Sequence, residues 1–374
     1  MPEELAGASP HAVETSGASA NRSPARTPRI TLEVRLQMPG WTQALIIGGS
    51  VLVGLAISVL ILGMAGVPAS ELASEFADSI LDAQSFHAVL IQAAPLILVG
   101  VAASIGFQAR FWNLGLEGQM VWGGIAATAI SLGHVGPDGS RLALMAVAAM
   151  LGGMMWVTIP ATLKYWCKVN EIIATLLLNY VATLFLYNLL YGAWKDPGDS
   201  FPHSAEYAMG ERLPDIGFSI NAALPIALVA MIAIWWLTQV SRFGFYLTFI
   251  HANEPMAGRV GVPTRRVTVA AILLSGALAA LAGFVISAGQ EGRLTQGFFE
   301  GYGFSGILIA FLARNNPLLA AIVAILIAML FVVGQTLQIF YQIPFAMVQM
   351  IQAIIVMCVA TSDFFIRHRI NLHR

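Results

Sequence analysis

Charged side chains are scarce in this sequence. Only 10% of its 374 residues are charged, whereas 57% are hydrophobic, and the formal net charge is −1. A soluble globular domain carries about 25% charged residues, so the composition excludes an ordinary soluble domain and indicates an integral membrane protein. The near-zero net charge also gives no basis for nucleic-acid binding.

Motifs for phosphate binding, catalysis and metal binding are missing as well. The three lysines, Lys164, Lys168 and Lys195, do not follow a glycine, so the sequence contains no G-x-x-x-x-G-K-[ST] phosphate loop. Neither HExxH nor GxSxG occurs. The two cysteines, Cys167 and Cys358, are too far apart in sequence for a metal or redox motif. We therefore expect a non-enzymatic chain without a metal site or a cofactor of its own.

The hydrophobic residues gather in ten apolar segments, which predict an all-α polytopic membrane protein with about ten transmembrane helices. A helix needs about 20 residues to cross the hydrocarbon core of a bilayer. The segments are residues 43–66, 86–106, 113–135, 141–163, 171–192, 219–238, 268–288, 303–313, 318–338 and 345–362. The segment at 303–313 is too short for a plain spanning helix. We expect it to be broken or re-entrant, which is tolerated only where protein or water covers the backbone.

The distribution of arginines and acidic residues predicts the orientation of the chain. Residues 1–40 are rich in Ala, Ser and Pro and indicate a disordered leader. Arginines in this leader and in the basic tail at 367–374 place both termini in the cytoplasm, and the basic loop 239–267 belongs on the same side. The acidic loop 193–218 should face outside. Because the composition changes sharply only near residue 40, we expect one membrane domain, residues 41–366.

The stretch at residues 113–120 (NLGLEGQM) places an amide and a carboxylate inside a predicted membrane segment. An acidic side chain at the centre of a bilayer costs about 2.5–3.5 kcal/mol, so it rarely lies there without a role. In a helix, Asn113 and Glu117 would share a face, and that face should point into the bundle or a wet cavity. The alternative is that Glu117 only ties two helices together.

Uncharged amides recur in the predicted spans. Amides both donate and accept hydrogen bonds, so they suit a neutral, hydroxyl-rich solute, although hydrogen bonds between helices are the alternative use. Gln335 and Gln338 lie three residues apart and share a helix face. Small residues recur at Ser275, Ala279 and Gly283, which predicts the close approach of another helix. The other amides are Gln92, Gln119, Asn170, Asn179, Asn188, Gln349 and Gln352.

Three stretches resemble the permease subunits of ATP-binding cassette (ABC) importers. Residues 113–120 resemble the pattern N-[IL]-G-[VL]-E-G-Q, and residues 170–180 (NEIIATLLLNY) are similar to N-E-[VI]-[IV]-x-T-L-[ML]-L-N-Y. Residues 301–317 (GYGFSGI…NP) are similar to G-Y-G-F-x-G-I-A…N-x-P. The resemblance covers residues 43–365. It points to the branched-chain amino acid/simple sugar permease superfamily, and within it to nucleoside-type permeases served by basic-membrane-lipoprotein receptors.

This resemblance implies a transmembrane permease subunit that translocates a nucleoside or related simple sugar across a bacterial inner membrane by alternating access. A separate cytoplasmic ABC ATPase would bind ATP and Mg, and no cofactor is expected in this chain. The other implied partners are a second permease subunit, giving a heterodimer, and an external solute-binding lipoprotein or periplasmic protein. All of these would work at the lipid bilayer.

Two sets of candidate residues follow. The loop 239–267 is similar to the segment that contacts the ATPase, although Thr248 and His251 stand where the family pattern has arginine and glycine. The expected ATPase-coupling residues are Asn253, Glu254, Ala257, Arg259 and Gly261. The expected pathway residues, near the solute pathway or holding its broken helices, are Asn113, Glu117, Gln119, Asn179, Gln335 and Gln338.

Two other functions fit the composition. A stand-alone gradient-driven transporter of a small polar solute also has many helices, buried amides and broken segments, but inverted repeats are typical of that class. The sequence shows only a loose echo, between residues 107–124 and 290–307, which are both rich in glycine with one glutamate. A non-transporting membrane scaffold has no reason to keep so many amides in the membrane, so it ranks last.

Overall fold

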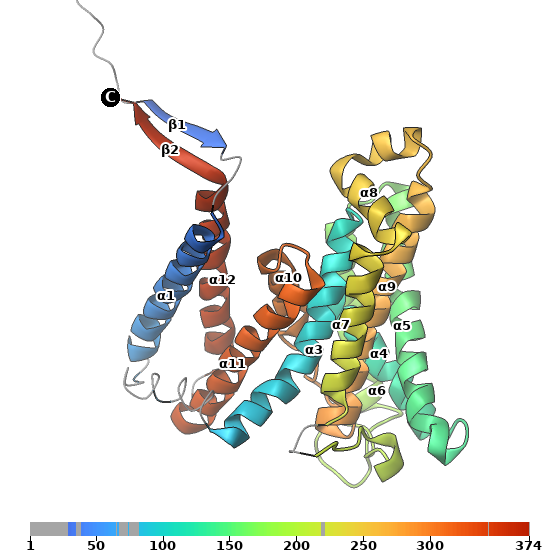
Figure 1. Cartoon of the computed structure of the whole chain (residues 1–374). Coiled ribbons are helices and arrows are strands. Elements are labelled where there is room, and N and C mark those ends of the chain that lie inside the picture. Colours follow the sequence, from blue (N-terminus) through green and yellow to red (C-terminus); the bar gives the residue numbers. More distant parts are fainter. Residues whose placement is uncertain are drawn as a thin grey trace, which may run out of the picture.

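Helices make up nearly all the regular structure of the chain (Figure 1). The structure is a computed structural model that describes residues 29–34, 39–64, 66, 74, 82–217, 221–342 and 344–373. The long helices are α1 (Gly40–Met64), α3 (Ala83–Gln108), α4 (Leu116–Leu132), α5 (Asp138–Cys167), α6 (Glu171–Tyr191), α7 (Ala223–Gln239), α8 (Arg242–Arg259), α9 (Thr264–Ile286), α10 (Tyr302–Leu312), α11 (Pro317–Tyr341) and α12 (Phe345–Arg367). The shorter elements are the 3-10 helix η1 (Met209–Glu211), the π-helix η2 (Ser287–Glu291) and the strands β1 (Arg29–Val34) and β2 (His368–His373).

Each of the ten predicted apolar segments overlaps a helix, so a nearly all-helical fold is confirmed, with the β1–β2 pair as the exception. Backbone N–H and C=O groups in lipid must form their hydrogen bonds within the protein, because no water is present to pair with them. Apolar runs of this length therefore form helices. Among the described residues, seven helices are long and apolar enough to cross a membrane. Helices α7 and α8 pass the same test together but are bent by 68°, and α4 and α10 have 17 and 11 residues. A total of about ten spans therefore remains a prediction.

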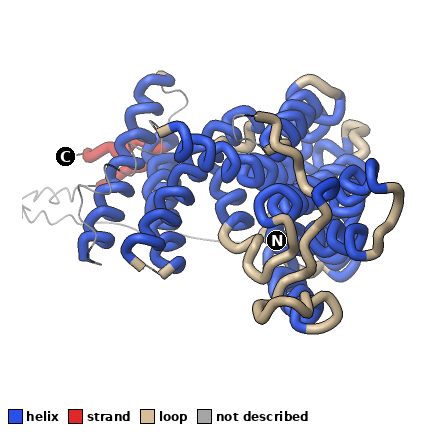
Figure 2. The backbone as a smooth tube through the Cα atoms, turned by 90° about the horizontal axis from the view of Figure 1, so that it is seen from below, coloured by secondary structure: helices blue, strands red, loops and turns tan. Residues whose placement is uncertain are grey.

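The two ends of the described chain lie together. Strand β1 pairs antiparallel with β2, with Arg29 opposite His373 and Val34 opposite His368, so this part of the predicted leader has regular structure. Helix α8 lies at the same end of the molecule as these strands, whereas the loop between α6 and α7 lies at the opposite end (Figure 1). Seen from below, loops of that opposite end lie across the helices of the bundle (Figure 2). Which end faces the cytoplasm stays a prediction, and residues 1–28 lie outside the described residues.

Helix α9 is the centre of the main bundle, in contact with α3, α4 and α5. Glycines allow this close packing. A Cβ atom added at Gly283 would lie 2.8 Å from the carbonyl carbon of Met120 in α4, and one added at Gly276 would lie 2.7 Å from the carbonyl oxygen of Gly153 in α5. The predicted approach of another helix to the small residues of α9 is thus confirmed, and it occurs on two sides.

Candidate functional site

The NLGLEGQM stretch begins outside a helix. Helix α3 ends at Gln108 and α4 begins at Leu116, so Asn113 does not share a helix face with Glu117 as expected. The reason is local: Asn113 Oδ1 accepts a hydrogen bond from the backbone N–H of Gly115 at 3.1 Å, which offers the backbone an alternative to the helix.

Asn113 is the centre of a closed network of hydrogen bonds. Its Nδ2 donates to Gln119 Oε1 and to Ser275 Oγ, each at 3.0 Å, and its Oδ1 accepts from Gln119 Nε2 at 2.8 Å. Ser275 Oγ donates in turn to the carbonyl of Ala102 at 2.7 Å. The network joins α3, α4 and α9 around a side chain that has no exposed surface at all.

The stretch at residues 170–180 holds the stretch at residues 113–120 in place. Asn179 in α6 donates from Nδ2 to the carbonyl of Leu114 at 2.9 Å and accepts from the backbone N–H of Gly118 at 2.8 Å. Thr175, one turn earlier, accepts from the N–H of Leu114 at 3.3 Å. Two of the three stretches that carry the family resemblance, residues 113–120 and 170–180, are therefore one structural unit.

The sequence left two roles open for the expected pathway residues: lying near the solute pathway, or holding its broken helices. Asn113, Gln119 and Asn179 are buried and use their amides on each other and on the backbone of residues 113–118. Their geometry fits the role of holding a broken helix rather than that of contacting a solute.

Glu117 lies in the first turn of α4 and faces the beginning of α10. A Cβ atom at Gly303 would lie 3.1 Å from Glu117 Cδ, so the absence of a side chain there lets the two helices meet. The carboxyl group lies against the backbone N–H groups of Gly301, Gly303 and Phe304, and its Oε1 has no hydrogen-bond partner among the described residues. The positive end of a helix dipole favours an anion at this place. Glu117 thus joins α4 to α10.

A cavity of about 340 Å³ opens beside the start of α10. It lies between α3, η2, α10 and α11, toward the end of α9 that is remote from α8. Its lining residues are Gln92, Ile286, Gln290, Glu291, Thr295, Gly297, Phe298, Glu300, Tyr302, Phe331 and Gln335. Of the expected pathway residues, only Gln335 lines it; Gln338 lies on the same helix but not in this wall.

Amides and one phenol hold the inner wall of this cavity. Gln92 Nε2 donates to the hydroxyl of Tyr302 at 2.6 Å, and that hydroxyl donates to Gln290 Oε1 at 3.4 Å. Gln290 Nε2 donates to the carbonyl of Ile91 at 3.1 Å. The cavity therefore offers amides, hydroxyls, two carboxylates and aromatic faces, and no lysine, arginine or histidine among its described lining residues. Such a set suits a neutral solute with many hydroxyl groups and disfavours an anion.

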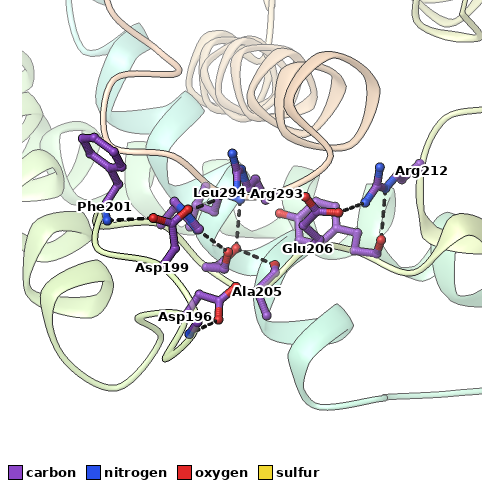
Figure 3. A network of polar contacts seen from close by, with 12 residues as sticks. Asp196, Asp199, Phe201, Ala205, Glu206, Arg212, Arg293 and Leu294 are labelled. Carbon is purple, nitrogen blue, oxygen red and sulfur yellow. Dashed lines mark hydrogen bonds and ion pairs between the residues drawn. The ribbon is translucent and has the colours of Figure 1, made fainter.

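The loop between α6 and α7 binds the segment that continues from η2 into the cavity wall (Figure 3). Ser204 donates its N–H to the carbonyl of Leu294 at 3.0 Å, and Ser204 Oγ accepts from the N–H of Leu294 at 2.9 Å. The backbone N–H of Tyr207 donates to the carbonyl of Gly292 at 2.8 Å. Charged contacts surround these bonds, with Arg212 paired to Glu206 at 2.7 Å.

A histidine lies at the centre of this loop contact. His203 Nδ1 donates to the carbonyl of Ser204 at 3.0 Å, and its Nε2 lies 2.8 Å from Asp199 Oδ2 and 3.2 Å from a nitrogen of Arg293. A carboxylate only accepts hydrogen bonds, and a guanidinium only donates them. Nε2 therefore donates to Asp199 when it carries a proton and accepts from Arg293 when it does not. The bonds to Ser204 and Asp199 raise the pKa of His203, and the bond to His203 lowers the pKa of Asp199.

Helix α8 is two short helices joined at a kink. Asn253 has non-helical angles (φ −158°, ψ 98°), and its side-chain Oδ1 accepts from the N–H of Met256 at 3.1 Å, which begins the second piece. Ala257 is buried against the bundle, and Gly261, at φ 87°, follows the helix in the left-handed conformation. Arg259 is exposed. The second piece therefore presents a short exposed face at the end of the molecule.

Sequence reasoning missed several of these residues. Tyr302 was noted only as part of a motif, and Gln92 only as one amide among many, although the two bond to each other 210 positions apart. The π-helix η2 was not predicted either, since it continues directly from α9 at the end of the apolar segment 268–288.

Comparison with known proteins matches residues 85–360 to the family described as branched-chain amino acid transport system / permease component. The chain is 32% identical to the glucose ABC transporter permease protein TsgB13 of Haloferax volcanii, over 92% of this chain and 94% of that protein. The guanosine ABC transporter permease protein NupP of Bacillus subtilis is 28% identical over 84% of this chain and 92% of its own length. The nucleoside ABC transporter permease protein NupB of Lactococcus lactis is 24% identical over 68% and 73%. Each of these last two bacteria has a second matching permease protein, NupQ and NupC, at 24% identity.

Proposed function

This chain belongs to the family of branched-chain amino acid transport system permease components, and from this premise we propose that it imports a nucleoside or a simple sugar. It would act as the membrane subunit of an ABC importer, with ATP and Mg bound on a separate ATPase. Relatives named for glucose, guanosine and nucleosides carry solutes that are all neutral and rich in hydroxyl groups.

The cavity beside α10 is the observation that supports this solute class. Phe298, Phe331 and Tyr302 offer aromatic faces for a sugar ring or a base, and Gln92 and Gln335 offer amides for hydroxyl groups. The carboxylates of Glu291 and Glu300 accept hydrogen bonds from hydroxyl or amino groups and repel phosphates. The proposed substrate is therefore a nucleoside rather than a nucleotide, or a sugar rather than a sugar phosphate.

The arrangement of the elements supports alternating access. The cavity lies toward the end of α9 that is remote from α8, and α10 runs from the cavity wall at Tyr302 toward Asn315, which contacts the end of α3. ATP-driven movement of α8 would tilt the helices and expose the cavity to one side and then to the other. The proposed partners are a second permease subunit in a heterodimer, a cytoplasmic ABC ATPase and an external solute-binding lipoprotein or periplasmic protein. The proposed location is a bacterial inner membrane.

Contact between α8 and the ATPase gives a direct test of this function. Met256 is 62% exposed on the second piece of α8, beside Glu254 and Arg259. In the substitution Met256→Asp, a new charge would enter the apolar centre of the interface, and we expect at least tenfold weaker co-purification of the ATPase, equivalent to about 1.4 kcal/mol. Arg259→Ala, which removes a guanidinium, should weaken co-purification of the ATPase less than Met256→Asp does.

The matched control is Met209→Asp. Met209 is 86% exposed in η1, at the end of the molecule opposite α8, so this variant should retain the ATPase in full. Undiminished co-purification in both Met256→Asp and Arg259→Ala would show that α8 is not the contact and would count against the importer mechanism.

A further inference from the structure

Arg110, just after α3, completes the hydrogen bonding of α8. Its Nε donates to the carbonyl of His251 at 3.0 Å, and a terminal nitrogen donates to the carbonyl of Ala252 at 3.1 Å. The residue four positions after His251 is Pro255, which has no N–H to donate. The residue four positions after Ala252 is Met256, whose N–H donates to Asn253 instead. Arg110 therefore supplies the two donors that the kink in α8 removes.

The backbone of Arg110 is itself held in place. Its carbonyl accepts a hydrogen bond from Lys164 Nζ at 2.9 Å, and the same nitrogen pairs with Glu171 at 2.8 Å. Arg110 has a φ of 55°, the left-handed region that residues other than glycine rarely adopt. The guanidinium thus projects from a constrained position onto α8.

Gln108 makes the matching contact to α10. Its Nε2 donates to the carbonyl of Asn315 at 2.6 Å, and the N–H of Asn315 donates to the carbonyl of Ala310 near the end of α10 at 2.9 Å. Helices α3 and α10 also meet directly, since a Cβ atom at Gly306 would lie 2.9 Å from the carbonyl carbon of Val99. Two residues apart in sequence, Gln108 and Arg110 therefore bind the end of α10 and the kink of α8.

Helix α10 leads from this contact to the cavity. Its 11 residues span about 16 Å at the usual rise per residue. At the other end, Tyr302 bonds to Gln92 and lines the cavity, and the backbone of Gly303 lies against Glu117. A displacement of α8 thus has a continuous path of hydrogen bonds and close packing to the cavity wall.

We propose that Gln108 and Arg110 are positioning residues that carry the displacement of α8 to α10 and so couple ATP hydrolysis to the opening of the cavity. The proposal rests on the proposed function, because it requires that the ATPase moves α8. Both side chains act through other residues and would not touch the solute.

The test is the amount of solute taken up per ATP hydrolysed, measured on the complete importer in proteoliposomes. Arg110→Met keeps an unbranched stem but removes both donors, and Gln108→Met, which keeps the length of the side chain, removes the donor to Asn315. We expect each variant to retain the ATPase and to hydrolyse ATP, while uptake per ATP falls about tenfold. The solute concentration at half-maximal uptake should stay unchanged. Arg110→Lys keeps the charge, but a single ammonium group cannot donate to both carbonyls in the same geometry. Its uptake per ATP should therefore lie between the values of the wild type and Arg110→Met.

Lys168→Met is the matched control, because Lys168 is an exposed cation at the same end of the molecule. It should leave uptake per ATP at the wild-type value. In the double variant of Gln108 and Arg110, uptake per ATP should fall no further than in the more affected single variant, because both residues belong to one linkage. An unchanged ratio in both single variants, or loss of ATPase binding in step with uptake, would overturn the proposal. A wild-type complex that shows no ATP-dependent uptake would instead refute the proposed function.

Discussion

Gly283→Val is expected to prevent formation of the folded permease. A Cβ atom at Gly283 would lie 2.8 Å from the carbonyl carbon and 3.0 Å from the Cα of Met120, and closer still to the carbonyl oxygen. These are backbone atoms, so no side-chain rotation relieves the clash, and α4 must separate from α9. Overpacking of a core costs about 1–3 kcal/mol and occasionally more, and a backbone clash belongs at the upper end of that range.

The measurement is thermal unfolding of the purified variant in detergent, together with the yield of monodisperse protein. Gly63→Val is the matched control, because Gly63 is also helical and a Cβ atom there meets no atom within 4 Å. Both substitutions carry the same change in helix propensity, so their difference reports packing alone. Equal unfolding temperatures for the two variants would show that α4 and α9 are not in contact at Gly283.

Asn113→Leu is expected to produce the second largest loss of stability. The side chain makes four hydrogen bonds, to Gln119, Ser275 and Gly115, and has no exposed surface. Hydrogen bonds inside membrane proteins contribute about 0.6 kcal/mol each on average, so the four together give about 2.4 kcal/mol. Leucine has a similar volume, so the loss would come from unpaired polar groups rather than from a cavity.

Chemical unfolding of the variant in detergent measures this loss. Asn188→Leu provides the comparison, since Asn188 is an exposed amide on α6, and it should change the free energy of unfolding by less than about 0.5 kcal/mol. If Asn113→Leu unfolds like the wild-type protein, the network around the NLGLEGQM stretch does not stabilise the broken helix.

The helices were predictable because lipid permits few alternatives. A run of about 20 apolar residues must satisfy its own backbone, so hydropathy alone located α1, α3, α5 and α9. The β1–β2 pair was not anticipated, since neither strand carries an apolar run and their pairing joins residues 29–34 to residues 368–373, far apart in sequence. The start of α4 was placed three residues early because a turn made by a single asparagine side chain competes with a helix that hydropathy alone predicts.

The candidate site was only partly predictable. The stretch at 113–120 was recognised as unusual, but its partners Thr175 and Asn179 could be assigned only after folding, because 61 positions separate the bonded residues. Arg110 was not singled out at all. Its role depends on Pro255, which removes a donor from α8 at a place that only the folded chain brings near α3. Local patterns identify helices and broken segments, whereas the contacts between them depend on the three-dimensional packing.

Solute uptake into proteoliposomes tests most directly whether this chain serves an ATP-driven importer. The vesicles would hold this chain with its second permease and the ATPase, with ATP trapped inside and the receptor outside with labelled guanosine or glucose. We predict uptake of one of these solutes that requires both ATP and receptor and that is lost when the phosphate-loop lysine of the ATPase is replaced. Uptake by this chain alone, driven by an ion gradient and indifferent to ATP, would contradict the importer function.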